Sequence, residues 1–279
     1  MERYAKLTGS KAHRKFTPPN LGRQRGQIKH REWLKGMLTR DERERYDRQI
    51  MITGFGEEGQ EKLKRARAFI AGAGGLGSAA SIYLVAAGIG MIRLVDHDRV
   101  ELSNLNRQVL HWDKDIGRTK VTSATEKLKQ LNQEVEVEGI QERITEANVY
   151  QLVDGFDLIV DAMDNLPTRY LLNKTALDKN IPFFHGAVHG FEGRAMTIIP
   201  GKSACLWCLY RGAAREGKFP ILGVTPAVIG CIQAAEVIKY IVGISPLLTD
   251  RLLIYDGQNM KFTELKIKKN QNCEYCGHL

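Results

Sequence analysis

A glycine-rich turn between two apolar segments constrains the fold of this chain most strongly. Residues 68–71 (AFIA) lead into residues 72–77 (GAGGLG), and the small-residue segment 78–84 (SAASIYL) follows. This order predicts a strand, a tight turn and a helix, with glycines that let the backbone approach a phosphate. The free N–H groups and partial positive charge at the helix N-terminus favour bound anions. The turn therefore predicts a phosphate-binding site in an α/β fold.

Strands and helices are expected to alternate along the central part of the chain. The expected strands are 68–72, 92–96, 134–138, 158–161 and 182–186, and the expected helices are 76–87, 120–131, a short one near 146–153, and 168–179. This alternation predicts a doubly wound, mostly parallel, Rossmann-like sheet. After Gly190 the pattern changes to strands at 194–199, 252–255 and 261–268, with a long apolar helix at 227–242. We expect this C-terminal part to be antiparallel.

Four charged residues after the turn indicate which nucleotide it would bind. Asp96 follows Gly72 by 24 residues at the end of an expected strand, close to the roughly 20-residue offset of a ribose-binding acid. Those two features alone predict a dinucleotide enzyme, so an NAD-dependent oxidoreductase is the alternative from another class. Arg107 and Lys120 follow the second strand, and Asp164 follows another. Because a triphosphate requires several cations and usually Mg²⁺, the full set favours ATP.

Four of the five cysteines form two Cys-x-x-Cys pairs, at Cys205 and Cys208 and at Cys273 and Cys276. Two such pairs predict a closed, structural Cys₄ zinc site that ties the C-terminal tail to the segment after the sheet. Disulfides and redox pairs are the alternatives. Cys231 lies within the expected apolar helix, and we expect a buried structural thiol there.

The N-terminal 40 residues carry the whole charge imbalance of the chain. They contain 11 Lys and Arg against 2 acidic residues, which equals the net charge of +9 for all 279 residues. We therefore expect a basic, flexible arm at 1–40 and one globular domain at 41–279. The first helix of this domain is expected to start with a capping box at Thr39 and Glu42 and to include residues 45–50. Contact of the arm with RNA or an acidic protein, or a role as a transit peptide, are the alternatives.

No uninterrupted apolar run reaches the roughly 18 residues of a membrane span. The first residues also lack the apolar stretch of a secretory signal. These observations predict a cytoplasmic protein without a membrane partner.

Several motifs together closely resemble the family of MoeB, ThiF and HesA, which are relatives of the ubiquitin-activating enzymes. The motifs are RYDRQI at 45–50, GAGGLG at 72–77, LVDHD at 94–98, LSNLNRQ at 102–108, GRTK at 117–120, DAMDN at 161–165 and the two Cys-x-x-Cys pairs. The resemblance covers about six-sevenths of the chain. It implies adenylation of the C-terminal glycine of a ubiquitin-like protein, commonly a sulfur carrier ending in Gly-Gly. Members that activate a small peptide or a modified tRNA base are the alternative within the family.

The resemblance also implies roles for individual residues. The nucleotide-binding set is Gly72, Gly74, Gly75, Asp96, Ser103, Asn104, Leu105, Asn106, Arg107, Lys120, Asp164 and Asn165. In this set, Gly75 would lie under the phosphates, Asp96 would hold the ribose, and Asn104, Arg107 and Lys120 would contact the phosphates. Asp164 with Asn165 would serve the Mg²⁺ end. The catalytic set would be Arg107, Lys120, Asp164 and Arg48, of which Arg48 resembles an arginine that reaches into the partner subunit's site and so implies a homodimer.

The chain departs from part of this family in one respect. Members that form a thioester or persulfide place a cysteine in the loop before the long apolar helix, whereas residues 209–226 contain none and offer Arg211, Arg215 and Lys218. We therefore expect activation without a thioester on this chain, with the sulfur supplied by another protein. His185 and His189 are expected to be core or loop histidines, with a place in the substrate channel as the alternative.

Overall fold

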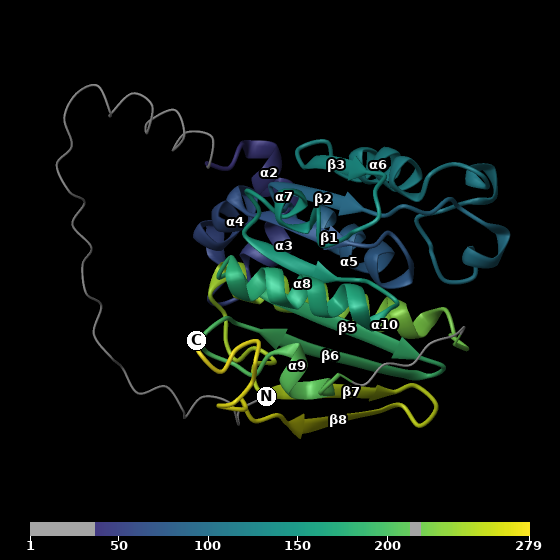
Figure 1. Cartoon of the computed structure of the whole chain (residues 1–279). Helices are drawn as coiled ribbons and strands as arrows, with labels where there is room; N and C mark the ends of the chain where they lie inside the picture. The colour runs from purple at the N-terminus through teal and green to yellow at the C-terminus, as the bar shows by residue number, and fades with distance from the viewer. Residues whose placement is uncertain (1–36, 213–218) are drawn as a thin grey trace, which may run out of the picture. The chain divides into compact units, whose positions relative to one another are not determined.

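A computed structural model describes residues 37–212 and 219–279. All the helices and strands described below belong to one compact unit, Leu38–Leu279, which Figure 1 shows with its elements labelled. The predicted basic arm lies almost entirely outside the described residues, as do Arg215 and Lys218. The division into an arm and a single globular domain therefore stays a prediction.

One eight-stranded sheet forms the centre of this unit, in the order β3-β2-β1-β4-β5-β6-β7-β8. The strands are β1 (Arg67–Ala71), β2 (Met91–Val95), β3 (Glu136–Ile140), β4 (Leu158–Asp161), β5 (Phe183–His189), β6 (Glu192–Ile198), β7 (Arg251–Asp256) and β8 (Lys261–Lys266). The pairings from β3 to β5 are parallel, and those from β5 to β8 are antiparallel. The predicted mixed architecture is confirmed.

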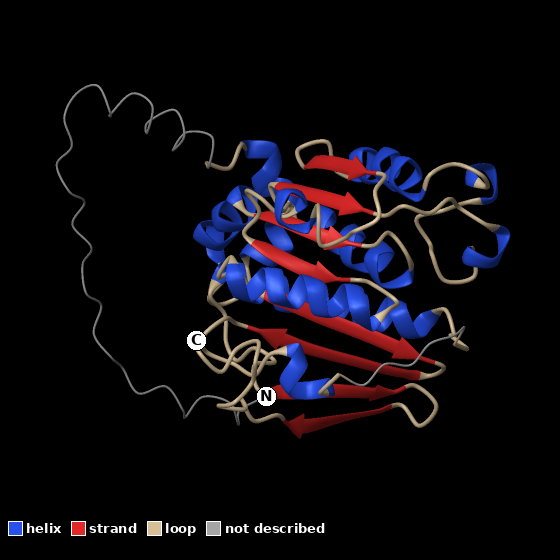
Figure 2. Cartoon of the chain, in the orientation of Figure 1, coloured by secondary structure: helices blue, strands red, loops and turns tan. Residues whose placement is uncertain are grey.

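The helices lie on both sides of this sheet (Figure 2). They are α2 (Arg40–Arg45), α3 (Asp47–Ile50), α4 (Gly56–Arg65), α5 (Gly75–Ala86), α6 (Lys120–Leu131), α7 (Val149–Leu152), α8 (Leu166–Asp178), α9 (Leu206–Tyr210) and α10 (Val224–Val242), with short 3₁₀ turns at Leu102–Asn104 and Asp113–Asp115. The capping box predicted at Thr39 and Glu42 is present. The first expected helix is interrupted at Tyr46, which separates α2 from α3.

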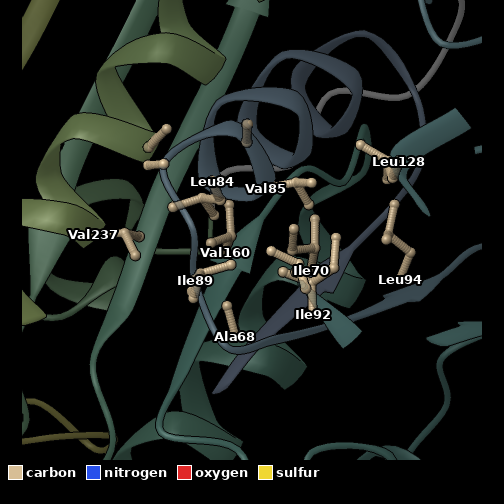
Figure 3. Packing of buried hydrophobic residues seen from close by; sticks show 14 of the residues in the cluster. Ala68, Ile70, Leu84, Val85, Ile89, Ile92, Leu94, Leu128, Val160 and Val237 are labelled. Atoms are coloured by element: carbon tan, nitrogen blue, oxygen red, sulfur yellow. The ribbon is translucent and has the colours of Figure 1, made fainter. Parts of the chain in front are cut away.

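The sheet separates two apolar layers, because successive residues of each strand face opposite sides. In β1, Ile70 packs with side chains of α4, α5, α6 and α10, whereas Phe69 packs with side chains of α7, α8 and α9. Figure 3 shows the first layer, where Ile70 and Ile92 from the strands gather near Leu84 and Val85 of α5. Burial on both faces explains why β1 and β4 read as continuous apolar runs.

Helix α10 is long and mostly apolar, although it contains no uninterrupted apolar run of 18 residues. It spans 19 residues and, by length and composition alone, is apolar enough to cross a membrane. It contains Glu236 and Lys239, so a search for uninterrupted apolar runs does not detect it. Its inner face packs in the first apolar layer through Ala234 and Val237, and the side chain of Gln233 donates to the carbonyl oxygens of Asp161 and Phe184. These contacts are those of a core helix in an α/β domain.

The chain reverses its direction across the sheet between β1 and β4. From β1 it proceeds through α5 to β2 and β3 on one side, and then crosses to β4 on the other side. Ligands of open α/β sheets bind at the carboxyl ends of the strands where such a reversal occurs. The topology therefore places the candidate site at the ends of β1, β2 and β4.

Candidate active site

A cleft of about 800 Å³ opens at this edge of the sheet. One part of its wall, called here the glycine-loop half, consists of Gly72, Gly74, Gly75, Asp96, Asp98, Arg107, Gln108 and Lys120. The other part, called here the Tyr210 half, consists of Ala187, Val188, His189, Glu192, Arg194, Tyr210, Phe219 and Ile221. Residues 162–166, which follow β4, contribute to the same wall.

Two glycines of the turn cannot be replaced without moving the backbone. Gly72 has a φ of +104°, and a Cβ on it would lie 2.7 Å from the carbonyl oxygen of Ala162. A Cβ on Gly77 would lie 1.9 Å from the carbonyl oxygen of Gly72. Helix α5 begins at Gly75 with Gly74 as its N-cap, and no side chain caps it. Its first N–H groups are therefore available to an anion in the cleft.

A buried histidine fixes this turn from behind. His111 Nε2 lies 2.9 Å from the carbonyl oxygen of Ala73, and its Nδ1 lies 3.0 Å from Ser123 Oγ. Because a carbonyl only accepts, Nε2 carries the proton, and the neutral ring accepts from Ser123 at Nδ1. Burial lowers the pKa of His111, and its bond to Ala73 opposes this only in part. The neutral ring thus couples the phosphate turn to α6, the helix that carries Lys120.

Asp96 is bound to the turn that it follows in sequence. Its carboxylate accepts from the N–H of Ala73 at 2.9 Å and from the N–H of Asp98 at 2.8 Å. The side chain also lines the cleft. Asp96 therefore stabilises the turn in addition to the ribose contact that the sequence predicts for it.

The two predicted phosphate cations have different surroundings. Lys120 has a side chain only 8% exposed, and its Nζ lies 2.8 Å from Asp98 Oδ2. Burial tends to raise the pKa of Asp98, but Lys120 outweighs this effect and the pKa is lowered. Arg107 donates to the carbonyl oxygen of Ser103 at 2.8 Å and to Asn106 Oδ1 at 3.1 Å. No carboxylate among the described residues forms an ion pair with Arg107, so its charge is available to a ligand.

Other members of the predicted nucleotide set lie outside the cleft wall. Asn104 is buried and closes the local turn by accepting from the N–H of Glu101 at 3.0 Å. Ser103, Asn106 and the partly buried Leu105 belong to the same turn, and the first two orient Arg107. Residues 103–106 therefore position the Arg107 side chain, and they do not line the cleft themselves.

Arg48 also lies outside the cleft wall. It is exposed on α3, and no hydrogen bond or ion pair of Arg48 is found within the part of the chain that the structure describes. The cleft of this single chain is therefore formed without the fourth residue of the predicted catalytic set.

Asp164 presents an exposed carboxylate to the cleft, in the segment that follows β4. Its Oδ1 accepts from Asn165 Nδ2 at 3.3 Å. Asn165, and not Asp164, is the N-cap of α8, since its Oδ1 accepts from the N–H of Thr168 at 3.0 Å. Asp164 therefore does not cap α8, and its carboxylate oxygens can take a ligand.

The Tyr210 half is supported by a buried polar cluster that sequence reasoning missed. Asp161 is fully buried, and its Oδ2 lies 2.7 Å from His185 Nδ1 and 3.5 Å from Arg169 Nε. His185 is also fully buried, and its Nε2 lies 3.0 Å from the hydroxyl of Tyr210. The expectation of a core histidine is correct for His185, whereas His189 lines the cleft. The members of this cluster come from β4, α8, β5 and α9, so no local motif marks them.

The four paired cysteines form one cluster. Their Sγ atoms all lie within 4.8 Å of one another, and the closer pairs are Cys205–Cys208 at 3.9 Å, Cys205–Cys273 at 3.7 Å and Cys208–Cys276 at 3.6 Å. Four sulfurs around a tetrahedral Zn²⁺, each at about 2.3 Å, would be about 3.8 Å apart. The cluster is therefore consistent with zinc, and all five cysteines are free of disulfides.

Cys231 differs from its predicted environment. It is partly exposed on α10 rather than fully buried, and it is absent from the cleft wall. Burial still raises the pKa of its thiol, which lowers its nucleophilicity at neutral pH. Nothing in this geometry places Cys231 where it could accept an activated acyl group.

Comparison with known proteins gives a consistent result. The ThiF family model matches residues 46–275. The SAMP-activating enzyme E1 of Haloferax volcanii is 43% identical over 240 residues, which cover 84% of this chain and 88% of that protein. The sulfur carrier protein adenylyltransferase of Thermus thermophilus is 40% identical over 250 residues, which cover 86% and 92%. The crystal structure of E. coli MccB with ATP matches with a TM-score of 0.73 at 28% identity, over 79% of this chain and 69% of that chain.

The fold and the cleft thus define an ATP-using α/β adenylyltransferase of the E1-like type. The chain belongs to the ThiF family. This confirms the resemblance expected from the motifs between residues 45 and 276.

Proposed function

We propose that this chain uses ATP to adenylate the C-terminal glycine carboxylate of a ubiquitin-like sulfur-carrier protein and releases pyrophosphate. The observation that carries the proposal is the cleft itself, which joins a phosphate-binding turn and two cations to a second half with room for another substrate. The names of the Haloferax and Thermus relatives, at 43% and 40% identity, support this class of substrate. Family membership also weighs against the NAD-dependent alternative, which leaves Arg107 and Lys120 without a role.

The chemistry requires no general base. A C-terminal carboxylate has a pKa of about 3.3–3.7 and is ionised at neutral pH. One of its oxygens attacks the α-phosphorus, the new C–O–P linkage forms, and the bond from that phosphorus to the bridging oxygen breaks as pyrophosphate leaves. The barrier is the approach of an anion to a polyanion, which positioned cations and N–H donors lower. In this chain, Arg107, Lys120 and the α5 N-terminus are placed to do so.

Asp164 with Asn165 fits the predicted Mg²⁺ end of the site. A carboxylate is the ligand that Mg²⁺ prefers, and the carboxylate of Asp164 is exposed in the cleft wall with only Asn165 bonded to it among the described residues. Bound Mg²⁺ would neutralise phosphate charge. The role of Asp164 itself is to fix where the ATP phosphates sit relative to the incoming carboxylate.

The cysteine cluster is proposed to hold structural Zn²⁺. It joins the start of α9 to the C-terminal residues 273–276, and Tyr210 at the end of α9 lines the cleft. Burial raises the pKa of Cys205 and Cys276, so a bound cation would be needed to hold these sulfurs as thiolates. The cluster is closed and thus suited to a structural role.

We propose a homodimer because of the position of Arg48. Arg48 is exposed and lies outside the cleft of its own chain. The RYDRQI motif at 45–50 resembles the family motif whose arginine enters the partner subunit's site. In a homodimer, Arg48 of each copy would therefore complete the phosphate-binding set of the other.

The product is proposed to leave as an acyl-adenylate that reacts with a sulfur donor on another protein. No cysteine lies between residues 209 and 226, and Cys231 is outside the cleft wall. We therefore expect no covalent thioester between the carrier and this chain. If one is found and survives in Cys231→Ser, Cys231 is not its site.

Exchange of labelled pyrophosphate into ATP tests the proposed function directly. We expect exchange that depends on a carrier protein ending in Gly-Gly and stops when the last glycine is removed. A matched carrier with an amidated C-terminus retains the surface of the carrier but lacks the nucleophile, so it should be inactive. Exchange that is driven by RNA or by a short peptide, and not by any carrier, would overturn the choice of substrate.

A further inference from the structure

Tyr210 occupies a distinctive position in the cleft. It is the last residue of α9, is partly exposed and lines the Tyr210 half. Behind it stand the fully buried His185 and Asp161, on the neighbouring strands β5 and β4. The rings of His185 and Tyr210 meet edge to face at 5.6 Å between centroids. A hydroxyl in the cleft wall is thus hydrogen-bonded to a histidine–carboxylate pair buried inside the sheet.

The hydrogen bonds of this cluster set the direction of the Tyr210 proton. The Asp161 carboxylate also pairs with Arg169 and accepts from the N–H of Met163 at 3.1 Å, so it acts as an acceptor toward His185 Nδ1. A neutral imidazole has a single N–H, which leaves Nε2 as an acceptor. Tyr210 therefore donates its hydroxyl proton to His185. The guanidinium of Arg194 donates to the same oxygen, which leaves one lone pair for a group on the cleft side.

The charges around this hydroxyl support the same direction. Burial lowers the pKa of His185, and the positive charges of Arg169 and Arg194 lower it further. The hydrogen bond to Asp161 raises it in part. A neutral His185 that donates from Nδ1 to Asp161 can only accept at Nε2, so Tyr210 donates inward.

A peptide tail that ends in glycines offers few groups for recognition. It has no polar side chains, so an enzyme can bind only its backbone N–H groups, its carbonyl oxygens and its carboxylate. In the Tyr210 half, Arg194 is a donor only, and Glu192 is engaged with it at 2.6 Å. The oxygen of Tyr210 is held in place as an acceptor by two buried residues. Backbone N–H groups are the complementary partner.

We propose that Tyr210, oriented by His185 and Asp161, is a substrate-positioning residue whose hydroxyl oxygen accepts a backbone N–H of the incoming carrier tail. The proposal rests on the proposed function, since it assigns the second substrate to the Tyr210 half. It gives the buried Asp161–His185 pair a role in orienting the tyrosine. The cysteine cluster also contributes, because it fixes the start of the helix that ends at Tyr210.

Tyr210→Phe is the direct test, because it removes one oxygen and keeps the ring that packs on His185. In carrier-dependent pyrophosphate exchange, we expect the KM for the carrier to rise about three- to tenfold, the usual effect of one lost neutral hydrogen bond. The KM for ATP should not change. Tyr150→Phe is the matched control, since Tyr150 donates its hydroxyl to Asp178 away from the cleft wall. An unchanged carrier KM in folded Tyr210→Phe would overturn the proposal.

A substrate-side change identifies the group that Tyr210 contacts. A carrier whose last glycine is replaced by glycolic acid has an ester in place of the final peptide N–H and keeps its terminal carboxylate. An otherwise identical carrier with an ester one bond earlier probes the preceding N–H. One of these two carriers should raise the KM for the wild-type enzyme about three- to tenfold and raise it little further for Tyr210→Phe. Losses of equal size in both enzymes for both carriers would exclude an N–H contact with Tyr210.

The two proposals fail in different ways. If no carrier supports exchange with the wild-type enzyme, the proposed function is wrong. If the wild-type enzyme supports exchange but the effects of Tyr210→Phe and of the ester carriers on the carrier KM are simply additive, only the role of Tyr210 is wrong.

Discussion

The two halves of the cleft use different physical means to bind their ligands. The glycine-loop half relies on backbone N–H groups, on Arg107, which has no carboxylate partner among the described residues, and on Lys120, which is paired with Asp98. The Tyr210 half relies on a buried Asp161–His185 pair that orients one hydroxyl. The first arrangement suits a flexible polyanion, because charge and many donors tolerate several phosphate geometries. The second suits one extended chain with a defined hydrogen-bond register.

Asp164 belongs to the wall that both halves share, so its loss should have the largest effect. Asp164→Ala should lower the rate of pyrophosphate exchange by at least about 100-fold, because a charged ligand for the phosphate end is lost. The melting temperature should stay within about 2 °C of the wild type, since the side chain is exposed and bonded only to Asn165 among the described residues. Asp154→Ala, which removes an exposed acid paired with Lys179, is the matched control. Near-normal exchange in Asp164→Ala would refute its assignment.

A change confined to the glycine-loop half should separate the two substrates. Arg107→Ala should lower kcat/KM for ATP about 30- to 100-fold, because the phosphate end loses a cation that no carboxylate of the described residues neutralises. The KM for the carrier should change less than twofold. Arg99→Ala controls for the loss of a surface arginine that also donates to a carbonyl, that of Gly117 at 2.7 Å. If both substrates were affected equally, the division of the cleft into two halves would be wrong.

Disruption of the cysteine cluster should affect the Tyr210 half of the cleft. Cys276→Ser removes one sulfur of the cluster that holds the start of α9, and we expect the melting temperature to fall by about 5–10 °C. At 20 °C, where the variant should still be folded, its KM for the carrier should rise about fivefold. ATP should stabilise it as much as it stabilises the wild type. Metal analysis should show loss of bound zinc. Cys231→Ser, outside the cluster, should leave zinc content and both KM values unchanged.

The glycine-loop half could be predicted from sequence, and the reason is local. Gly72, Asp96 and Lys120 belong to short motifs at strand ends, and the order of strands alone brings such ends to one edge of the sheet. The Tyr210 half could not, because Asp161, His185 and Tyr210 are separated by more than 20 residues each and meet only through tertiary packing. The pairing of Lys120 with Asp98 was missed for a different reason: Asp98 lies in the quoted motif LVDHD, but spacing does not show which acid points at the lysine.

Tertiary context also overrides local patterns elsewhere in the chain. The first expected helix breaks at Tyr46, whose hydroxyl accepts from Asn132 at 2.8 Å, a contact 86 residues away in the sequence. Strand β3 begins two residues later than predicted, at Glu136, where pairing with Met91 of β2 starts. Helix α6 and strand β4 have the predicted bounds, because in each case a cap or a buried apolar run coincides with the tertiary boundary.

One buried neutral histidine lies behind each half of the cleft, and acid should distinguish the two. Burial lowers the pKa of both His111 and His185 below the value of about 6.5 expected in the unfolded chain. Below pH 6.5 the unfolded state therefore binds more protons, so the free energy of unfolding falls as the pH falls, by at most about 1.4 kcal/mol per pH unit for each ring. His185 has the carboxylate of Asp161 to offset part of this effect. Among the described residues, the ring nitrogens of His111 bond to Ala73 and Ser123 and to no carboxylate. The charges of Lys120 and Lys127 oppose its protonation, and Asp96 favours it.

We therefore expect His111→Gln to remove more of the acid sensitivity between pH 6.5 and 5 than His185→Gln does. Chemical denaturation at several pH values measures this difference, which should be smaller than the effects of the three preceding variants. His278→Gln, at an exposed histidine, is the control for replacing a histidine away from the cleft. If the His185 variant flattened the slope more, Asp161 would not offset the effect of burial on the His185 ring.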